Sequence, residues 1–185
     1  MTRVVAPLVR GAGRGTLASA ALAALVASGC SRGAEASVRA VDGAGLRAAL
    51  EAARGKALLL ATFATWDGDS VESMERVMTA STALREAGGK LMLLCVDRTG
   101  GGTLEAATGA ARRVAEKRNL TTEILVWSST ETVALDEAVP LEDAARISTL
   151  FPLAIAFRPD GNIAGTLAKE LTAEGLGKLV AGLAN

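Results

Sequence analysis

The sequence predicts an α/β domain in which helices pack on a sheet. Helical and strand-like patterns alternate along most of the chain, which is typical of this class. Two uninterrupted apolar runs, at residues 56–65 and 90–97, indicate strands that are buried on both faces. We find no internal repeat and no domain linker, and one domain is the expected number for a chain of 185 residues.

The first predicted elements are a short strand at Val38–Val41 and a helix over residues 43–54. In that helix Leu46 and Leu50 recur at the i, i+4 spacing of one helix face. The run KALLLATFAT, residues 56–65, follows between turn signals and is read as the first buried strand.

A longer helix is expected over residues 70–87. Its apolar side chains form one stripe, and a glycine pair at Gly88 and Gly89 ends it. The stripe consists of Val71, Met74, Val77 and Met78. The run KLMLLCVD, residues 90–97, is the second buried strand.

A third helix and a third strand are predicted at residues 104–119 and 122–127. The helix carries basic residues in its last turns, where they complement the helix dipole. The glycine-rich run before it, residues 99–103, lacks the lysine and the spacing of a phosphate-binding loop. We therefore expect a flexible connection there.

The last part of the chain predicts a helix, a β-hairpin and a closing helix. The first helix is expected over residues 141–149. The hairpin joins residues 153–157 to 163–166 through Pro159, Asp160 and Gly161. The closing helix, residues 172–184, is expected to be capped by Thr172, with Glu174 in its first turn.

The composition excludes several classes of function. The chain has 20 basic and 20 acidic residues, a formal net charge of zero, so it lacks the basic surface typical of nucleic-acid binding. It contains no histidine, which removes the commonest metal ligand and the usual general base near neutral pH. We therefore predict no nucleic-acid partner, no metal site and no cofactor.

The first 29 residues have the pattern of an export signal. A leader with Arg3, Arg10 and Arg14 precedes an apolar run at residues 17–26, which is too short to span a bilayer comfortably. The exit ASGC ends in Cys30 and resembles the lipobox of bacterial lipoproteins, although Ala27 stands where leucine is more common.

The lipobox resemblance implies lipid attachment to Cys30 and cleavage before it. The alternative is ordinary cleavage near Ala27, which leaves Cys30 as a free thiol. We expect a signal peptide at residues 1–29, a lipidated cysteine with a short polar tether at residues 30–37, and one domain at residues 38–185. The protein would be exported and anchored to a membrane by lipid, facing the periplasm or the extracytoplasmic side.

Three segments in this order resemble the thioredoxin-like superfamily, most closely its exported TlpA-like and redoxin branch. KALLLATFATWDGDSVESM is similar to the strand, corner tryptophan and active-site helix of that family. LMLLCVD is similar to the central strand, and LFPLAIAFRPDGNIAG to the proline loop and hairpin. The resemblance implies a thioredoxin-like fold, a central mixed sheet flanked by helices, with an inserted helix and strand at residues 104–127.

The resemblance also identifies positions at which this chain departs from the family. The redox motif W-C-x-x-C is replaced by Trp66, Asp67, Gly68, Asp69 and Ser70. Thiol–disulfide exchange needs a thiolate, and no side chain at this corner can supply one. The buried carboxylate that many thioredoxins carry six residues before the first cysteine is replaced by Ala61. The attacking cysteine of a peroxiredoxin would belong to the same corner.

The two aspartates at this corner have a structural and a functional interpretation. Asp67 or Asp69 can cap the helix, and Asp69 with Glu72 resembles a capping box. As a functional pair they could bind a cation with Glu72 or Glu75, but the run does not match a calcium loop. Capping is the interpretation that we favour, with metal binding and acid–base catalysis as alternatives.

Three further positions complete the candidate residues. Cys95 lies inside a strand run and is predicted to be an inert core thiol. The resemblance implies a cis peptide bond before Pro152, and it places Phe151 and Pro152 with Trp66 on one face. In family members the backbone beside this proline pairs with an extended peptide. The alternative for Trp66 is that it only packs the corner.

We expect a membrane-anchored, redox-inactive lipoprotein that binds or scaffolds an unidentified protein or peptide of the cell envelope. We expect no catalytic residue. The alternative is an enzyme, either a thiol–disulfide oxidoreductase or a redoxin-type antioxidant protein of the TlpA-like family, or a carboxylate-based activity. Its only support is analogy of fold, which does not by itself carry function.

Overall fold

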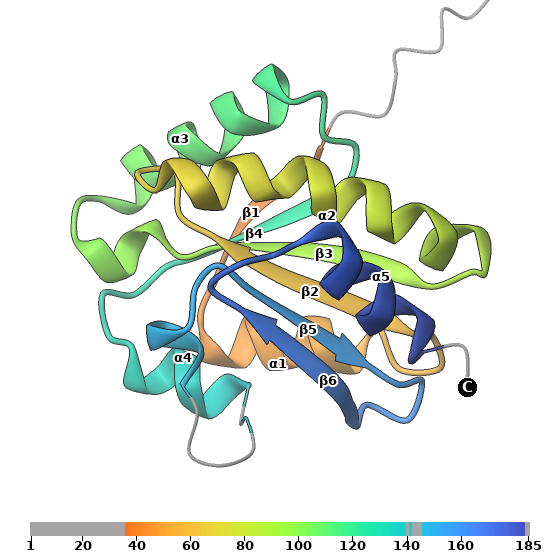
Figure 1. The fold of residues 1–185 in the computed structure, drawn as a ribbon. Helices are drawn as coiled ribbons and strands as arrows, with labels where there is room; N and C mark the ends of the chain where they lie inside the picture. Colours follow the sequence, from red (N-terminus) through yellow and green to blue (C-terminus); the bar gives the residue numbers. More distant parts are fainter. Residues whose placement is uncertain (1–35, 140, 142–145, 184–185) are drawn as a thin grey trace, which may run out of the picture. The chain divides into compact units, whose positions relative to one another are not determined.

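A computed structural model describes residues 36–139, 141 and 146–183. The predicted signal peptide, Cys30 and most of the tether lie outside the described residues. The described chain contains one sheet of six strands in the order β1-β4-β3-β2-β5-β6 (Figure 1). The strands are β1 (Val38–Val41), β2 (Leu58–Phe63), β3 (Lys90–Cys95), β4 (Glu123–Trp127), β5 (Leu153–Phe157) and β6 (Ile163–Ala168).

The sheet is mixed, as predicted. Strands β1, β4, β3 and β2 are parallel neighbours, whereas β5 runs antiparallel to both β2 and β6. The helices that connect the parallel strands are α1 (Gly43–Glu51), α2 (Gly68–Glu86) and α3 (Leu104–Lys117). The predicted insertion is α3 followed by β4, and β4 lies between β3 and β1.

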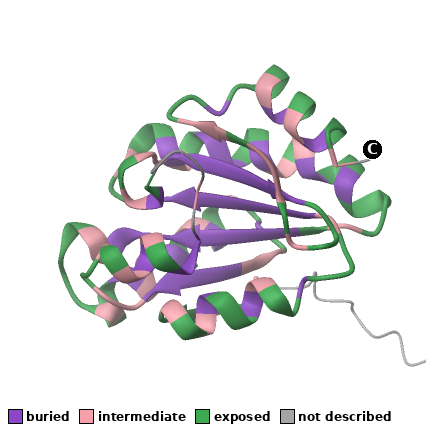
Figure 2. Ribbon diagram, turned by 90° about the horizontal axis from the view of Figure 1, so that it is seen from below, coloured by how far each residue is buried: buried purple, intermediate pink, exposed green. Residues whose placement is uncertain are grey.

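Successive side chains of the central strands enter two different cores, because side chains alternate between the faces of a strand. On β2, Leu58 and Leu60 join the core beneath α1 and the short helix α4 (Val133–Ala138). Leu59, Ala61 and Phe63 join the core beneath α2, α3 and the closing helix α5 (Ala173–Ala181). Figure 2 shows the inner strands as buried, which explains why β2 and β3 are apolar without alternation.

Helix α2 begins earlier than predicted, at Gly68, and its buried side is more polar than the predicted stripe. Met74 and Val77 are fully buried, but Ser70, Ser73 and Ser81 share that side with them. The helix ends as predicted at the glycine pair. Gly88 has a φ of +81°, which favours glycine, and a Cβ at position 89 would lie 2.4 Å from Leu84 Cδ1.

The prediction of a helix over residues 141–149 was wrong. The structure forms α4 earlier, where Leu135 and Ala138, three residues apart, pack into the core with α1. In the later segment Ile147–Thr149 forms a single 3₁₀ turn, and residues 142–145 lie outside the described part. The side chain of Asp136 accepts hydrogen bonds from the Ser148 N–H and hydroxyl, which ties this turn to α4.

The closing helix starts as predicted. Thr172 is its N-cap residue, and the Thr172 hydroxyl accepts a hydrogen bond from the Gly175 N–H at 3.1 Å.

Candidate functional site

Three segments meet at one edge of the sheet. Parallel strands β2 and β3 both end there, and the antiparallel β5 begins there. The segments are the corner at residues 64–70, the 3₁₀ turn Asp97–Gly100 and the loop before Leu153. We call this place the corner site. It contains the predicted positions Trp66 to Ser70 and Phe151 with Pro152.

A buried serine holds the base of the corner. Ser70 is fully buried, and its Oγ accepts a hydrogen bond from the Ala64 N–H at 3.0 Å. This bond closes the turn between the end of β2 and the first turn of α2. Ser73, one turn later, is also buried and donates to the Ser70 carbonyl oxygen. The Ser70 hydroxyl, which stands where the W-C-x-x-C motif has its second cysteine, is therefore hydrogen-bonded to the backbone.

Neither aspartate caps α2 in the way that the sequence suggested. Asp67 is the N-cap residue, but its side chain makes no capping hydrogen bond. The capping box between Asp69 and Glu72 requires Asp69 at the N-cap, whereas α2 already begins at Gly68. Asp69 is thus inside the first turn, where its negative charge still interacts favourably with the helix dipole.

A third carboxylate, which the sequence reasoning missed, holds the corner from its buried side. Asp97 is buried, with 9% of its surface exposed, and stands directly after β3. Its Oδ1 accepts from the Thr65 N–H at 2.6 Å, and its Oδ2 accepts from the Thr65 hydroxyl at 2.5 Å. The sequence did contain a signal, because Asp97 ends a buried strand run whose parallel neighbour ends at residues 63–65.

The exposed part of the corner site is aromatic. Trp66 has 58% of its surface exposed, and its ring meets the Phe151 ring edge to face, with centroids 5.5 Å apart and planes at 86°. On the other side a Cβ at Gly100 would lie 3.2 Å from Trp66 Nε1. Trp66 therefore lies between the proline loop and the 3₁₀ turn.

The proline loop is tied to β2 and β6. The Phe151–Pro152 peptide bond is cis, as the resemblance implied. The Leu153 N–H donates to the buried Thr62 hydroxyl at 3.0 Å, and the Pro152 carbonyl accepts from the Lys169 N–H at 2.8 Å. Within the part of the chain that the structure describes, no hydrogen bond joins the Phe151 N–H or C=O to another group.

Cys95 is the last residue of β3, where it pairs with Phe63 of β2, and it is fully buried. Burial raises the pKa of the Cys95 thiol far above its usual value, and the negative charge of Asp97 raises it further. A thiol in this state supplies no thiolate near neutral pH. Its position agrees with the prediction of a core residue.

The described residues include no group of three histidine, cysteine, aspartate or glutamate side chains that could hold a metal ion. Glu75, one of the residues considered as a cation ligand with Asp67 and Asp69, forms an ion pair with Arg118 instead. Chemically, the corner site offers an exposed aromatic side chain.

The domain is similar to solved thioredoxin-like thiol–disulfide oxidoreductases, and its fold is thioredoxin-like. A thiol:disulfide interchange protein of the thioredoxin family from Chlorobium tepidum has a TM-score of 0.57 at 16% identity, over 78% of this chain and 91% of that chain. A secreted Mycobacterium tuberculosis disulfide oxidoreductase has a TM-score of 0.51 at 15% identity, over 72% of this chain and 86% of that chain.

An exposed lipoprotein thioredoxin from Streptococcus pneumoniae gives a TM-score of 0.52 at 15% identity, over 72% of this chain and 90% of that chain. No family model matches the sequence, and none of the curated proteins is significantly similar to it. At these identities the likeness concerns the fold, so function has to be argued from the site itself.

Proposed function

We propose that this chain is an exported, lipid-anchored thioredoxin-like module that binds extended peptide segments of envelope proteins and does not catalyse thiol–disulfide exchange. The observation that carries the proposal is the corner site. The exposed Trp66 ring packs against the half-buried Phe151 ring, beside Asp67 and Ser70, which stand where a W-C-x-x-C motif has its two thiols. Within the described residues the Phe151 backbone has no hydrogen-bond partner.

The proposed lack of thiol–disulfide exchange follows from the positions of the two cysteines in the sequence, Cys30 and Cys95. Exchange requires a thiolate that can reach the sulfur of a disulfide. Cys95 is fully buried with a raised pKa, and Cys30 is the predicted lipidation residue outside the described part. The hydroxyl of Ser70 cannot substitute for a thiol, because it is buried against the Ala64 N–H.

Peptide binding is supported by the geometry of the proline loop. An extended segment that adds beside Phe151 would gain hydrogen bonds from backbone groups without a described partner. The side chains of that segment would meet the faces of Trp66 and Phe151, and aromatic residues of this kind supply much of the binding energy in protein interfaces. The loop itself is held in place through Thr62 and Lys169.

Export and anchoring are supported by the leader and by the lipobox-like ASGC sequence. Two proteins of similar fold are described as a secreted oxidoreductase and as an exposed lipoprotein thioredoxin. In the described residues no helix is long and apolar enough to cross a membrane.

Crosslinking and affinity capture from native membranes test the peptide-binding surface. We expect wild-type protein to recover a defined set of envelope proteins, and a Trp66→Ala variant to lose them. The matched control is Val133→Ala, because among the described residues Val133 is the other large apolar residue with high exposure, at 62%. Equal recovery by wild type and Trp66→Ala would contradict a docking role for the aromatic pair.

An insulin-reduction assay separates this proposal from an oxidoreductase. We expect wild type and Cys95→Ala to be equally inactive. An Asp67→Cys/Ser70→Cys variant restores two thiols at the corner and serves as the positive control for the assay. Turnover by wild type well above the Cys95→Ala variant would establish the oxidoreductase and remove the redox-inactive part of the proposal.

Metabolic labelling with palmitate tests the anchor. Label should be present on wild-type protein, and Cys30→Ala should remove it. Label that persists in Cys30→Ala would show that the lipid is attached to another residue.

A further inference from the structure

The amino end of the sheet, where the parallel strands begin, lies opposite the corner site. Helices α1, α2 and α3 end there, and the β5–β6 turn, residues 158–162, lies beside them (Figure 1). The chain also enters the domain at this end, because the Ser37 carbonyl oxygen accepts a hydrogen bond at 2.8 Å from the N–H of Ile124, near the start of β4. The predicted tether therefore joins the domain at the end that does not carry the corner site.

The predicted tether is shorter than the domain. From Cys30 to Ala36 a fully extended chain spans at most about 22 Å. Helix α2, which runs from the corner site to the amino end, has 19 residues and is therefore about 28 Å long. A tether of this reach keeps the amino end near the membrane, so the corner site faces sideways or away from the bilayer. This step rests on the lipid anchor of the proposed function.

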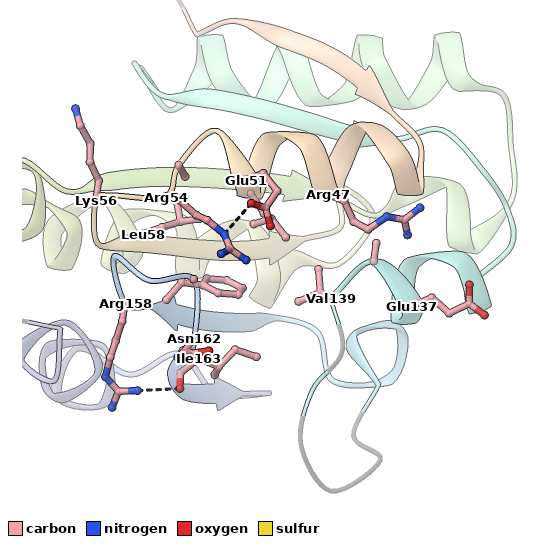
Figure 3. A pocket seen from close by; sticks show the side chains of 15 residues that line it. Arg47, Glu51, Arg54, Lys56, Leu58, Glu137, Val139, Arg158, Asn162 and Ile163 are labelled. Carbon is pink, nitrogen blue, oxygen red and sulfur yellow. Dashed lines mark hydrogen bonds and ion pairs between the residues drawn. The ribbon is translucent and has the colours of Figure 1, made fainter.

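The amino end has an excess of positive charge. Among the exposed side chains of this end that form no ion pair, cations outnumber anions. The cations are Lys56, Arg85, Lys90, Lys117 and Arg158, and the anions are Glu86, Glu116 and Asp160. The other cations of this end are in ion pairs: Arg39 with Glu123, Arg54 with Glu51, and Arg118 with Glu75. A cavity of about 730 Å³ opens nearby, but Lys56 and Arg158 point away from it (Figure 3).

The corner end has the opposite charge. In the connections and first helical turns that follow β1, β2, β3, β4 and β6, and in the loop before β5, anions outnumber cations. The anions are Asp42, Asp67, Asp69, Glu72, Asp97, Glu105, Glu131 and Glu170, and the cations are Arg98, Arg146 and Lys169. The domain is therefore polarised along its strands, with the positive charge at the end where the tether joins.

Backbone hydrogen bonds hold the amino end together as one surface. The Gly55 N–H donates to the Pro159 carbonyl oxygen at 2.8 Å, so the turn after α1 is bonded to the β5–β6 turn. The Lys90 N–H donates to the Ala57 carbonyl oxygen at 2.8 Å, which joins the start of β3 to the same turn. The segments that carry Lys56, Lys90 and Arg158 thus occupy fixed positions relative to one another.

We propose that the amino end of the sheet docks on an anionic phospholipid surface and directs the corner site away from the membrane. Lysine and arginine side chains near such a surface are attracted to its negative potential. The acidic corner end is repelled by the same surface, because like charges repel. The tether permits a sideways or an outward orientation of the corner site, and the charge distribution selects the outward one. Its peptide partner then approaches from the side of the domain that is remote from the bilayer.

Vesicle sedimentation tests the surface without the lipid anchor. The protein is the chain from residue 30 with Cys30→Ala, because both cores lie within residues 36–183 and include no part of the leader. We expect binding to phosphatidylglycerol-containing vesicles at low salt and release at high salt, since salt screens exposed charges. Phosphatidylcholine vesicles should bind at least about tenfold more weakly. Equal binding to both vesicles, or binding to heparin without binding to anionic vesicles, would overturn the inference.

Charge variants locate the surface. Lys56→Gln/Lys90→Gln/Arg158→Gln should weaken binding to anionic vesicles about tenfold or more, because each basic side chain adds to the attraction. The matched control is Arg47→Gln/Arg112→Gln/Arg113→Gln, which removes the same charge from exposed positions within α1 and α3. The control should bind as the unsubstituted chain does. Equal losses in the two triple variants would show that overall charge governs binding, and would overturn a docking role of the amino end.

The two tryptophans of the sequence report the orientation. Trp66 belongs to the corner site and Trp127 ends β4, so both lie at the corner end. Coupling the Cys30 thiol to a maleimide lipid anchors the chain, because Cys95 is fully buried. Energy transfer from tryptophan to a dansyl-labelled lipid should be lower in anionic than in neutral vesicles, and the triple variant of the amino end should abolish this difference. Higher transfer in anionic vesicles would place the corner end on the membrane and overturn the inference.

Palmitate labelling tests the anchor separately, since neither vesicle experiment uses the native lipid. Vesicle docking without label on Cys30 would support the surface and remove the proposed anchor. Label on Cys30 without vesicle docking would support the anchor and overturn the surface.

Discussion

The two ends of strand β2 present different surfaces. At its carboxyl end the corner site is held by hydrogen bonds to buried polar side chains, Ser70 and Asp97, and exposes the ring of Trp66. At its amino end lies a cavity that is lined by both apolar side chains and exposed charged side chains. The six residues of β2 place the two ends about 17–20 Å apart.

This difference predicts how substitutions at each end of β2 will affect the protein. Buried polar groups at the corner are expensive to leave without a partner, so substitutions there should act first on stability. The cations at the cavity are exposed, so their substitution should have little effect on folding. Because the two ends are well separated, effects at one should be independent of the other.

The largest effect is expected for Asp97→Ala. The substitution removes both acceptors of Thr65 and leaves a part-buried N–H and hydroxyl without partners. We expect a loss of about 2–4 kcal/mol in the free energy of unfolding, measured by urea denaturation. Asp97→Asn retains an acceptor oxygen and should lose less. A loss below about 0.5 kcal/mol for Asp97→Ala would contradict the importance of this carboxylate.

The next effect is a loss of stability at alkaline pH caused by Cys95. Its pKa in the folded protein is raised from 9.0 by burial, so above pH 9.0 the unfolded chain ionises while the folded chain does not. The stabilising contribution is complete below pH 9.0 and is lost as pH rises, by up to about 1.4 kcal/mol per pH unit. Urea unfolding between pH 8 and 10.5 should show a steeper decline for wild type than for Cys95→Ala. Parallel curves would mean that Cys95 titrates normally in the folded state.

A smaller effect on stability is expected for Trp66→Ala. The side chain is 58% exposed and makes one aromatic contact, with Phe151. The free energy of unfolding should change by less than about 1 kcal/mol, even though capture of envelope partners is lost. A much larger loss of stability would mean that Trp66 is mainly a structural residue, and it would confuse the capture experiment.

The smallest effect is expected at the turn beside the cavity. Hydrogen bonds from the Asn162 N–H and side-chain amide lower the pKa of the exposed Asp160 below its usual 3.8. Its contribution to stability is therefore present above pH 3.8 and is lost as pH falls through the lower folded value. The acid-unfolding midpoints of wild type and Asp160→Asn should differ slightly, with wild type losing this advantage only in acid. If the stability of wild type relative to Asp160→Asn instead increased as pH fell, the prediction would be wrong.

The sequence predicted most strands and the long helices because their signals are local. Apolar runs without alternation marked β2 and β3, and glycines marked the end of α2. The prediction from sequence failed between Trp127 and Leu153, where it placed a helix at residues 141–149 and did not find α4. Helix α4 is only six residues long and forms because Leu135 and Ala138 fit the core beside α1, a reason that its own sequence does not contain.

At the corner site, too, some features could be predicted from the sequence and others depend on tertiary structure. The sequence by itself determined that the corner carries Asp67 and Ser70 where a thiol pair would be needed, and that the chain has no histidine. It suggested aspartate caps, but the bonds that hold the corner come from Ser70 and Asp97. Asp97 follows a different strand, so only the parallel pairing of β2 with β3 brings it to Thr65.

The absence of a thiol pair at this corner was therefore determined by residue identity, which a sequence states directly. The surfaces at the two ends of the sheet were instead decided by tertiary structure. The Trp66–Phe151 pair joins residues 85 positions apart, and the amino end of the sheet joins the turn after α1 to the β5–β6 turn more than 100 positions later. Such surfaces exist only once strand pairing has placed distant loops at the same end of the sheet.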